Sequence, residues 1–163
     1  MFIRTKKIKK KEYAYLVSNR WTKKGARQKI LKYLGRAYSF KRRERQFDFD
    51  EKKDYGEIVY DLIRWELLKN DFKSEKNKKN ILFKKIGNKK IKVDLNKRNV
   101  FQDMAVLKNN EGFLCNYTIK KIFNFDLKEY KTKEEKMFEF AKAFVDSGIK
   151  VPKEVFISLF TKL

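Results

Sequence analysis

The sequence predicts an α+β protein: an N-terminal three-stranded antiparallel sheet with a packed helix, followed by a second β-hairpin and C-terminal helices. Three observations lead to this fold class. Residues 2–34 hold three segments rich in aromatic and branched side chains, separated by polar connections. Residues 54–72 place apolar side chains at helical spacing. The chain has 163 residues, 42% hydrophobic and 15% aromatic, which is enough to form a core.

The N-terminal sheet is predicted as a meander of three strands. Residues 2–8 and 12–19 form a hairpin, because both are rich in strand-forming residues and a short lysine-rich connection separates them. Residues 19–25 are expected to form a longer basic turn. Residues 26–34 alternate between two faces and form the third strand, which Gly35 ends.

A sheet of three strands is marginally stable alone, so a helix should cover its apolar face. Residues 54–72 are the predicted helix. Asp54 is its expected N-cap, and Glu57 three residues later completes a capping box. Trp65 falls on the apolar side of this helix and is interpreted as a core residue. The basic run 41–45, between sheet and helix, is either a flexible arm or a solvated link.

The stretch 73–80 contains no apolar side chain and predicts a solvated linker. It divides the chain into a basic sheet-plus-helix module, residues 1–72, and a C-terminal subdomain, residues 81–163. In the second part, strands at 81–86 and 90–95 flank a Gly-Asn turn and form a second hairpin, which residues 99–107 could extend.

Three helices are predicted after this hairpin. The first is a short helix at residues 113–123. Thr132 begins the second, with two glutamates in its first turn, and Gly148 ends it. The last runs from residue 151 to residue 163. The second carries an apolar stripe that forms either an intramolecular core or a homodimer face: Met137, Phe138, Phe140, Ala141, Phe144 and Val145.

Charge is unevenly distributed along the chain. The net charge is +22, and residues 1–45 contribute +15 of it, because they hold 17 Lys and Arg against Glu12 and Glu44. Residues 46–75 have a net charge of −4, residues 76–128 of +10 and residues 129–163 of +1. Such an excess opposes compaction by self-repulsion unless an anionic partner offsets it, so we expect a polyanionic partner.

The first basic stretch is the predicted nucleic-acid-binding site. Its cations alternate with aromatic rings, including Tyr33 and Tyr38, and this pattern suits phosphate neutralisation combined with stacking or groove contact. Scattered lysines elsewhere can equally serve solubility. The expected contact residues are Arg4, Lys6, Tyr13, Tyr15, Arg20, Trp21, Lys23, Lys24, Arg27, Lys29, Lys32, Arg36, Lys41, Arg42, Arg43 and Arg45.

The composition excludes several kinds of functional site. Histidine is absent and Cys115 is the single cysteine, which argues against zinc fingers, disulfide frameworks and Cys-His or His-based catalysis. We therefore expect no cofactor, no metal, and a core or surface thiol at Cys115. No apolar run approaches the roughly 20 residues needed to cross a bilayer, and the N-terminus lacks a signal-peptide core. A cytoplasmic protein without a membrane partner is expected.

Residues 1–4, 12–17 and 25–35 resemble the N-terminal module of insertion-sequence transposases of the IS4 and IS1634 kind and related archaeal proteins. The Tyr55-Gly56 step into the helix is similar as well, so the resemblance covers residues 1–72. The resemblance implies a DNA-binding module. It does not imply the nuclease, because the RNase H-like domain of these enzymes, with its three metal-binding carboxylates, needs more residues than follow.

Three functions are compatible with this pattern. The first is a non-catalytic DNA-binding protein whose sheet lies on the duplex. The second is an RNA-binding or ribosome-associated protein, since a pI near 10.0 and exposed aromatic rings also suit RNA. The third is a metal-dependent nuclease that uses the carboxylates at residues 48–57, although an acidic run before a helix more often offsets the helix dipole.

Overall fold

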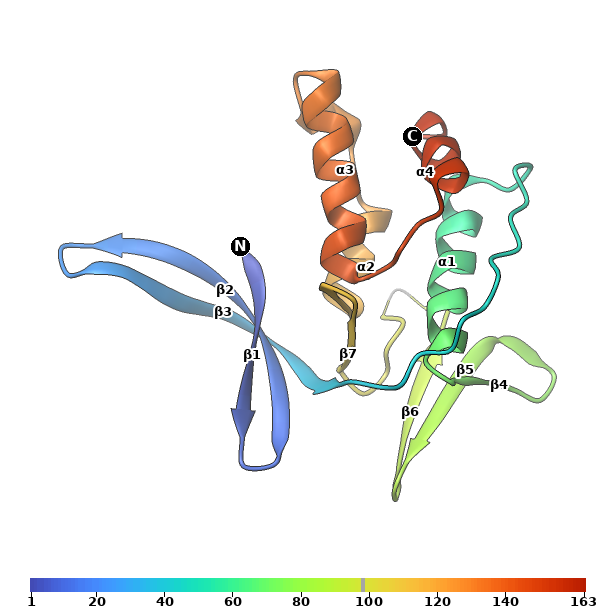
Figure 1. Cartoon of the computed structure of the whole chain (residues 1–163), viewed down its shortest axis with the longest axis horizontal. Helices are drawn as coiled ribbons and strands as arrows, with labels where there is room; N and C mark the ends of the chain where they lie inside the picture. Colours follow the sequence, from blue (N-terminus) through green and yellow to red (C-terminus); the bar gives the residue numbers. More distant parts are fainter. Residues whose placement is uncertain (98) are drawn as a thin grey trace.

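The computed structural model describes residues 1–97 and 99–163 and confirms the α+β class. Its elements follow in this order: β1 (Phe2–Ile8), β2 (Lys11–Thr22), β3 (Gly25–Tyr38), α1 (Tyr55–Lys69), β4 (Lys73–Glu75), β5 (Lys78–Ile86), β6 (Lys89–Asp94), β7 (Ala105–Asn109), β8 (Gly112–Leu114), α2 (Asn116–Phe123), a 3₁₀ turn (Leu127–Glu129), α3 (Lys133–Ser147) and α4 (Lys153–Thr161). Figure 1 shows the first three strands on one side of the molecule and the helices on the other.

The strands form two sheets. The larger has the order β1-β2-β3-β7-β8, and the smaller has the order β4-β5-β6. The antiparallel meander predicted for β1 to β3 is confirmed. Strand β3 then pairs in parallel with β7 over only three residue pairs, from Arg36 with Ala105 to Tyr38 with Leu107. This short pairing joins the N-terminal strands to the rest of the protein.

The turn between β2 and β3 is tighter than the sequence suggested. The predicted basic turn at residues 19–25 is wrong in extent, because residues 19–22 belong to β2 and only Lys23 and Lys24 separate Thr22 from its partner Gly25. Gly25 has a φ of +97°, which matches the left-handed residue that follows a type I turn in a hairpin. Arg20 and Arg27 thus lie on strands, and Lys23 and Lys24 form the turn between them.

Gly35 does not end the third strand, which continues to Tyr38. This glycine has a φ of +134°, and a Cβ placed on it would lie 1.4 Å from the carbonyl oxygen of Met104. Only a residue without a side chain allows the backbone before β7 to approach β3 so closely. Gly35 makes the parallel β3-β7 pairing sterically feasible.

The inner face of the N-terminal strands packs on α2, not on α1 as predicted. A small core of Ala14, Leu16, Leu34 and Ala37 includes Val106 of β7 and Cys115 at the start of α2, with Tyr117 packed against it. Because β7 places α2 beside β3, the neighbouring helix in space is not the next helix in the sequence. The other face of β1 to β3, called the outer face below, points away from α2.

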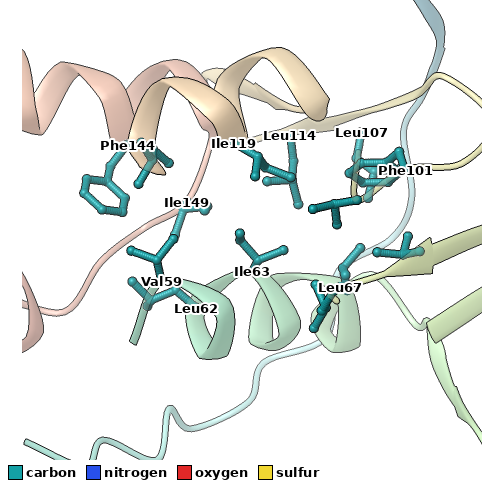
Figure 2. Packing of buried hydrophobic residues seen from close by; sticks show 14 of the residues in the cluster. Val59, Leu62, Ile63, Leu67, Phe101, Leu107, Leu114, Ile119, Phe144 and Ile149 are labelled. Atoms are coloured by element: carbon teal, nitrogen blue, oxygen red, sulfur yellow. The ribbon is translucent and has the colours of Figure 1, made fainter. Parts of the chain in front are cut away.

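Helix α1 belongs to the main core. The predicted capping box is present, since the Asp54 carboxylate accepts a hydrogen bond from the Glu57 N–H and the Glu57 carboxylate accepts one from the Asp54 N–H. Val59, Leu62, Ile63 and Leu67 of α1 face α2, α3 and the segment before β7 (Figure 2). Trp65 packs on Phe47, with 5.2 Å between ring centroids, and its indole N–H donates to the Arg45 carbonyl.

Residues 73–80 are not a linker. They form β4, a turn and the first residues of β5, paired through Glu75 and Lys78. An all-polar segment can form a hairpin when its side chains stay in solvent and the backbone hydrogen bonds are satisfied across the strands. The predicted hairpin of β5 and β6 is confirmed. Its predicted extension by residues 99–107 is reduced to one antiparallel bridge between Phe101 and Val93 of β6, because residues from Ala105 onward form β7, which pairs with β3 and β8.

The predicted boundaries of α3 are confirmed, but residues 113 and 114 of the predicted first helix belong to β8, and α2 begins at Asn116. Thr132 caps α3 through a capping box with Glu135, and Gly148 ends it with a left-handed φ of +72°. The predicted apolar stripe is divided. Phe140 and Phe144 are buried in the core, whereas the exposed members of the stripe are Met137, Phe138 and Val145. Among the residues described, no helix is long and apolar enough to cross a membrane.

Candidate nucleic-acid interface

Strands β2 and β3 extend beyond the sheet as a two-stranded ribbon, comprising residues 18–29 and called the ribbon below (Figure 1). Strand β1 pairs with β2 only as far as Val17, and β7 pairs with β3 only from Arg36 onward. The ribbon side chains are exposed except for the half-buried Ser18. Trp21, on β2 beside the turn, is 82% exposed. The six expected contacts carried by the ribbon are Arg20, Trp21, Lys23, Lys24, Arg27 and Lys29.

The ribbon concentrates positive charge. Arg20 lies directly opposite Arg27 in the register, and residues 13–43 contain no Asp or Glu. Like charges in directly opposed positions destabilise a strand pair. An anionic ligand on this surface would remove that penalty, so the pairing favours a bound polyanion.

The outer face brings together Arg4 and Lys6 of β1, Tyr13 and Tyr15 of β2, and Arg36 of β3. Tyr13 pairs with Arg36, and Tyr15 pairs with both Arg4 and Tyr33. Directly paired residues share a face of the sheet. The Arg4 guanidinium donates a hydrogen bond to Gln28 across the strands. Of the sixteen expected contacts, these five form a second group at the base of the ribbon.

Tyrosine rings line this outer face. The Tyr33 ring centroid lies 5.4 Å from that of Tyr15 and 6.3 Å from that of Tyr13, and the Arg36 guanidinium carbon lies 4.9 Å from the ring centroid of Tyr38. Partial burial and then the neighbouring phenols of Tyr15, Tyr13 and Tyr38 raise the pKa of Tyr33. Tyr33 therefore stays protonated and neutral at physiological pH.

A groove separates the outer face from β6. The space is about 460 Å³ in volume. Its lining consists of Lys11, Tyr13, Tyr33, Arg36 and Tyr38 on one side, Lys89, Lys90 and Ile91 on β6, and Asp103 and Ala105 at the start of β7. Lys90 lies opposite Lys85 in the β5-β6 register, so a second pair of like charges lies beside the groove.

The remaining expected contacts lie elsewhere. Lys32 pairs with Leu16 and lines a hollow near α2, away from the outer face. Arg42 is held by Glu66, a fully buried carboxylate 2.6 Å away, and also donates to Asn110. Such a buried pair is structural, because removing one partner leaves an unpaired buried charge.

The rest of the basic run lies beside the C-terminal end of α1. The Arg43 guanidinium lies 3.5 Å from the Asp71 carboxylate, and the Arg43 N–H donates to the Lys69 carbonyl. Lys41 and Arg45 are exposed. Phe40 and Phe47 on either side of this run pack against the main core, so the segment 41–45 is attached to the protein body and is not a detached arm.

Sequence reasoning did not include five groove residues among the expected contacts: Lys11, Tyr33, Tyr38, Lys89 and Lys90. The tyrosines could have been found from their place in the same aromatic-basic segment. Their common face could not, because β3 has register shifts opposite Ala14/Tyr15 and Leu16/Val17. The lysines of β6 reach the groove through tertiary packing, which leaves no local sequence signal.

Two features bear on catalysis. Cys115 is buried, and burial raises the pKa of its thiol, so it remains protonated. Among residues 1–97 and 99–163, no group of three or more acidic or cysteine side chains is arranged to hold a metal ion.

Comparison with family models, curated proteins and solved structures finds no match for this chain.

Proposed function

We propose that this protein is a non-catalytic nucleic-acid-binding protein that prefers duplex DNA and contacts it through the ribbon. The observation that carries the proposal is the direct opposition of Arg20 and Arg27 on an exposed, carboxylate-free ribbon. A two-stranded β-ribbon fits the major groove, and its cations can bind the flanking phosphates. The resemblance of residues 1–72 to the N-terminal module of insertion-sequence transposases also implies DNA as the ligand.

RNA is the second candidate ligand. The exposed ring of Tyr33, which is 42% accessible, favours contact with unpaired bases, and these are more common in folded RNA than in duplex DNA. A cytosolic ribosome-associated protein would have the same surface. The ribbon favours the duplex, whereas the tyrosines favour unpaired bases, so the ligands can be separated by experiment.

The test compares the affinity of the full chain for duplex DNA, single-stranded DNA and structured RNA at one salt concentration. Tightest binding to the duplex supports the proposal, and tightest binding to structured RNA replaces DNA by RNA as the ligand. Equally weak binding to all three contradicts the proposal. Incubating labelled probes with magnesium or manganese in parallel reveals any cleavage, which would overturn the non-catalytic assignment.

Quenching by acrylamide adds a readout of the site. Trp21 is almost fully exposed, whereas Trp65 is packed on Phe47 and under the Lys69 ammonium, whose nitrogen lies 3.9 Å from the ring centroid. The more strongly quenched part of the emission should therefore come from Trp21. Nucleic acid should protect it, and a Trp21→Phe variant should lose the protected signal.

A further inference from the structure

We propose that the groove between the outer face and β6 binds an unpaired nucleic-acid strand next to the duplex held by the ribbon. The protein would then prefer a duplex with a single-stranded extension over a blunt one. This inference rests on the proposed function, because the ribbon supplies the neighbouring duplex site.

The lining of the groove matches the chemistry of an unpaired strand. Tyr13, Tyr33 and Tyr38 present aromatic rings, and cations surround them at Lys11, Arg36, Lys89 and Lys90. Proteins that bind single strands combine such stacking platforms with a basic track for the backbone. The described lining contains these four cations and one carboxylate, that of Asp103, so its net charge is positive.

Size favours a strand over a duplex. The groove volume of about 460 Å³ falls within the roughly 300–1,000 Å³ typical of sites that bind a small ligand. Such a space accommodates a nucleotide-sized part of an unpaired strand. A duplex, whose bases are already stacked on each other, could not offer a free base to Tyr33.

The groove and the ribbon lie on the same strands. Tyr15, paired with Tyr33 at the groove, precedes Arg20 of the ribbon by five positions on β2. Strands rise about 3.3 Å per residue, so the two sites are roughly 17 Å apart, which is about five base pairs of duplex. Figure 1 shows the β1-β2 turn and the β5-β6 turn on the same side of the molecule. The groove is lined by residues of both hairpins, including Lys11 and Tyr13 of β2 and Lys89 and Lys90 of β6.

The opposed lysines of β5 and β6 give independent support. Lys85 pairs with Lys90, and the Lys90 ammonium lies 4.1 Å from the ring centroid of Phe83. A cation–π contact orients this ammonium but leaves its charge uncompensated. Phosphate groups of a strand in the groove would supply the missing negative charge.

The experiment measures the affinity of the full chain for three DNA probes by fluorescence anisotropy. One is a blunt duplex, the second carries a single-stranded extension of about six nucleotides, in either polarity, and the third is a blunt duplex with the same added number of phosphates. We expect the extension to tighten binding by about 5- to 100-fold relative to both blunt probes.

Variants of groove residues test whether the tighter binding conferred by the single-stranded extension arises in the groove. Tyr33→Ala and the pair Lys89→Ala with Lys90→Ala should lose most of it while binding the blunt duplex within about twofold of the parent. Tyr33→Phe keeps the ring and should keep the gain. The matched charge control is Lys78→Ala with Lys79→Ala, two exposed lysines of β5 outside the groove, which should also keep it. The lysine variants decide the outcome if Tyr33→Ala melts early.

The outcomes separate the two proposals. If the blunt duplex binds but the extension adds nothing, or if the gain survives both groove variants, the groove inference is wrong and the proposed function stands. If none of the probes binds, both are wrong. An equal loss of the gain in the groove and control lysine pairs would show general electrostatics and overturn the groove assignment.

Discussion

Trp21 is the residue whose environment differs most from that of a core aromatic. It is 82% exposed at the end of β2, next to Arg20 and two residues before Lys23, whereas Trp65 packs on Phe47 and donates a hydrogen bond to a backbone carbonyl. Exposing a large ring to water has no structural benefit, and a ring between cations can stack on a base or contact a groove. The two tryptophans therefore lie in different environments, and we infer a binding role for Trp21 alone.

Trp21→Ala should weaken nucleic-acid binding by about 1 to 3 kcal/mol if the ring stacks on a base, with little change in the salt dependence. The melting temperature should stay near that of the parent, because the side chain makes few contacts. Anisotropy titrations at several salt concentrations and a thermal melt measure both quantities. A variant that unfolds while it keeps its affinity would show that Trp21 is structural.

Glu12 links β2 to β7. The Lys108 ammonium donates to both Glu12 carboxylate oxygens, at 2.9 and 3.2 Å. A hydrogen bond from Thr5 and the contact with Lys108 lower the pKa of Glu12 below its ordinary value of 4.5. The ionised carboxylate therefore contributes stability that is present above pH 4.5 and lost as the pH falls through the lowered pKa.

Glu12→Gln should lower the free energy of unfolding at neutral pH by at most about 1 kcal/mol, since the pair is partly exposed. The difference from the parent should vanish at strongly acidic pH, where the parent carboxyl group is protonated. Urea denaturation at the two pH values measures it, with Glu44→Gln, an exposed carboxylate, as control. A difference that does not change with pH would contradict this account of Glu12.

At the scale of elements, local signals predicted well where each residue acts within its own element. The predicted N-caps of α1 and α3 are confirmed, because the side chains of Asp54 and Thr132 accept hydrogen bonds from backbone N–H groups only three residues away. Tertiary pairing determined the rest. Residues 73–75 form a strand because β5 pairs with them, and β7 leaves the second hairpin to pair with β3. Neither pairing has a local sequence signal.

The same limit applies to the candidate site. The first basic stretch was identified from its composition, and the ribbon and outer face carry eleven of the expected residues. Arg42 could not be distinguished from its neighbours in sequence, because its partner Glu66 lies in α1. The β6 side of the groove could not be predicted either, because Lys89 has no sequence feature that separates it from the other lysines. Its place in the groove depends on tertiary packing of the hairpin.

Gly25 and Gly35 have left-handed φ angles for different reasons, and alanine separates them. Gly35→Ala should destabilise the protein by more than about 3 kcal/mol, because its Cβ would clash with the Met104 carbonyl. Gly25→Ala should cost only about 1 to 2 kcal/mol, since the space around it is open. Denaturation midpoints test both. Equal losses would mean that the β3-β7 approach does not depend on Gly35.

At the scale of the whole molecule, the ribbon and the main core are separate, whereas the groove is lined in part by the core residues Ile91 and Ala105. Figure 1 places the ribbon on one side of the molecule and the helices on the other, and the main core lies among the four helices, the smaller sheet, β7 and β8. Substitutions on the ribbon should therefore change affinity without changing stability. Sites more than about 7–10 Å apart with no shared partners act independently.

The homodimer expected through the C-terminal helices remains a prediction at this scale. Phe138 is 66% exposed and Val145 is 53% exposed on α3. If this face forms a dimer, Phe138→Lys should convert the protein to a monomer in sedimentation analysis. A monomeric parent protein at high concentration would contradict the prediction.

The salt dependence of duplex binding tests the central claim most directly. If six to eight phosphates are neutralised, the logarithm of the affinity should fall with the logarithm of salt concentration with a slope of roughly −5 to −7. Lys23→Ala with Lys24→Ala should reduce this slope by about two for all sequences alike. Lys150→Ala with Lys162→Ala, exposed at the C-terminal end, should leave it unchanged. A slope near zero, or equal changes in both pairs, would contradict binding through the ribbon.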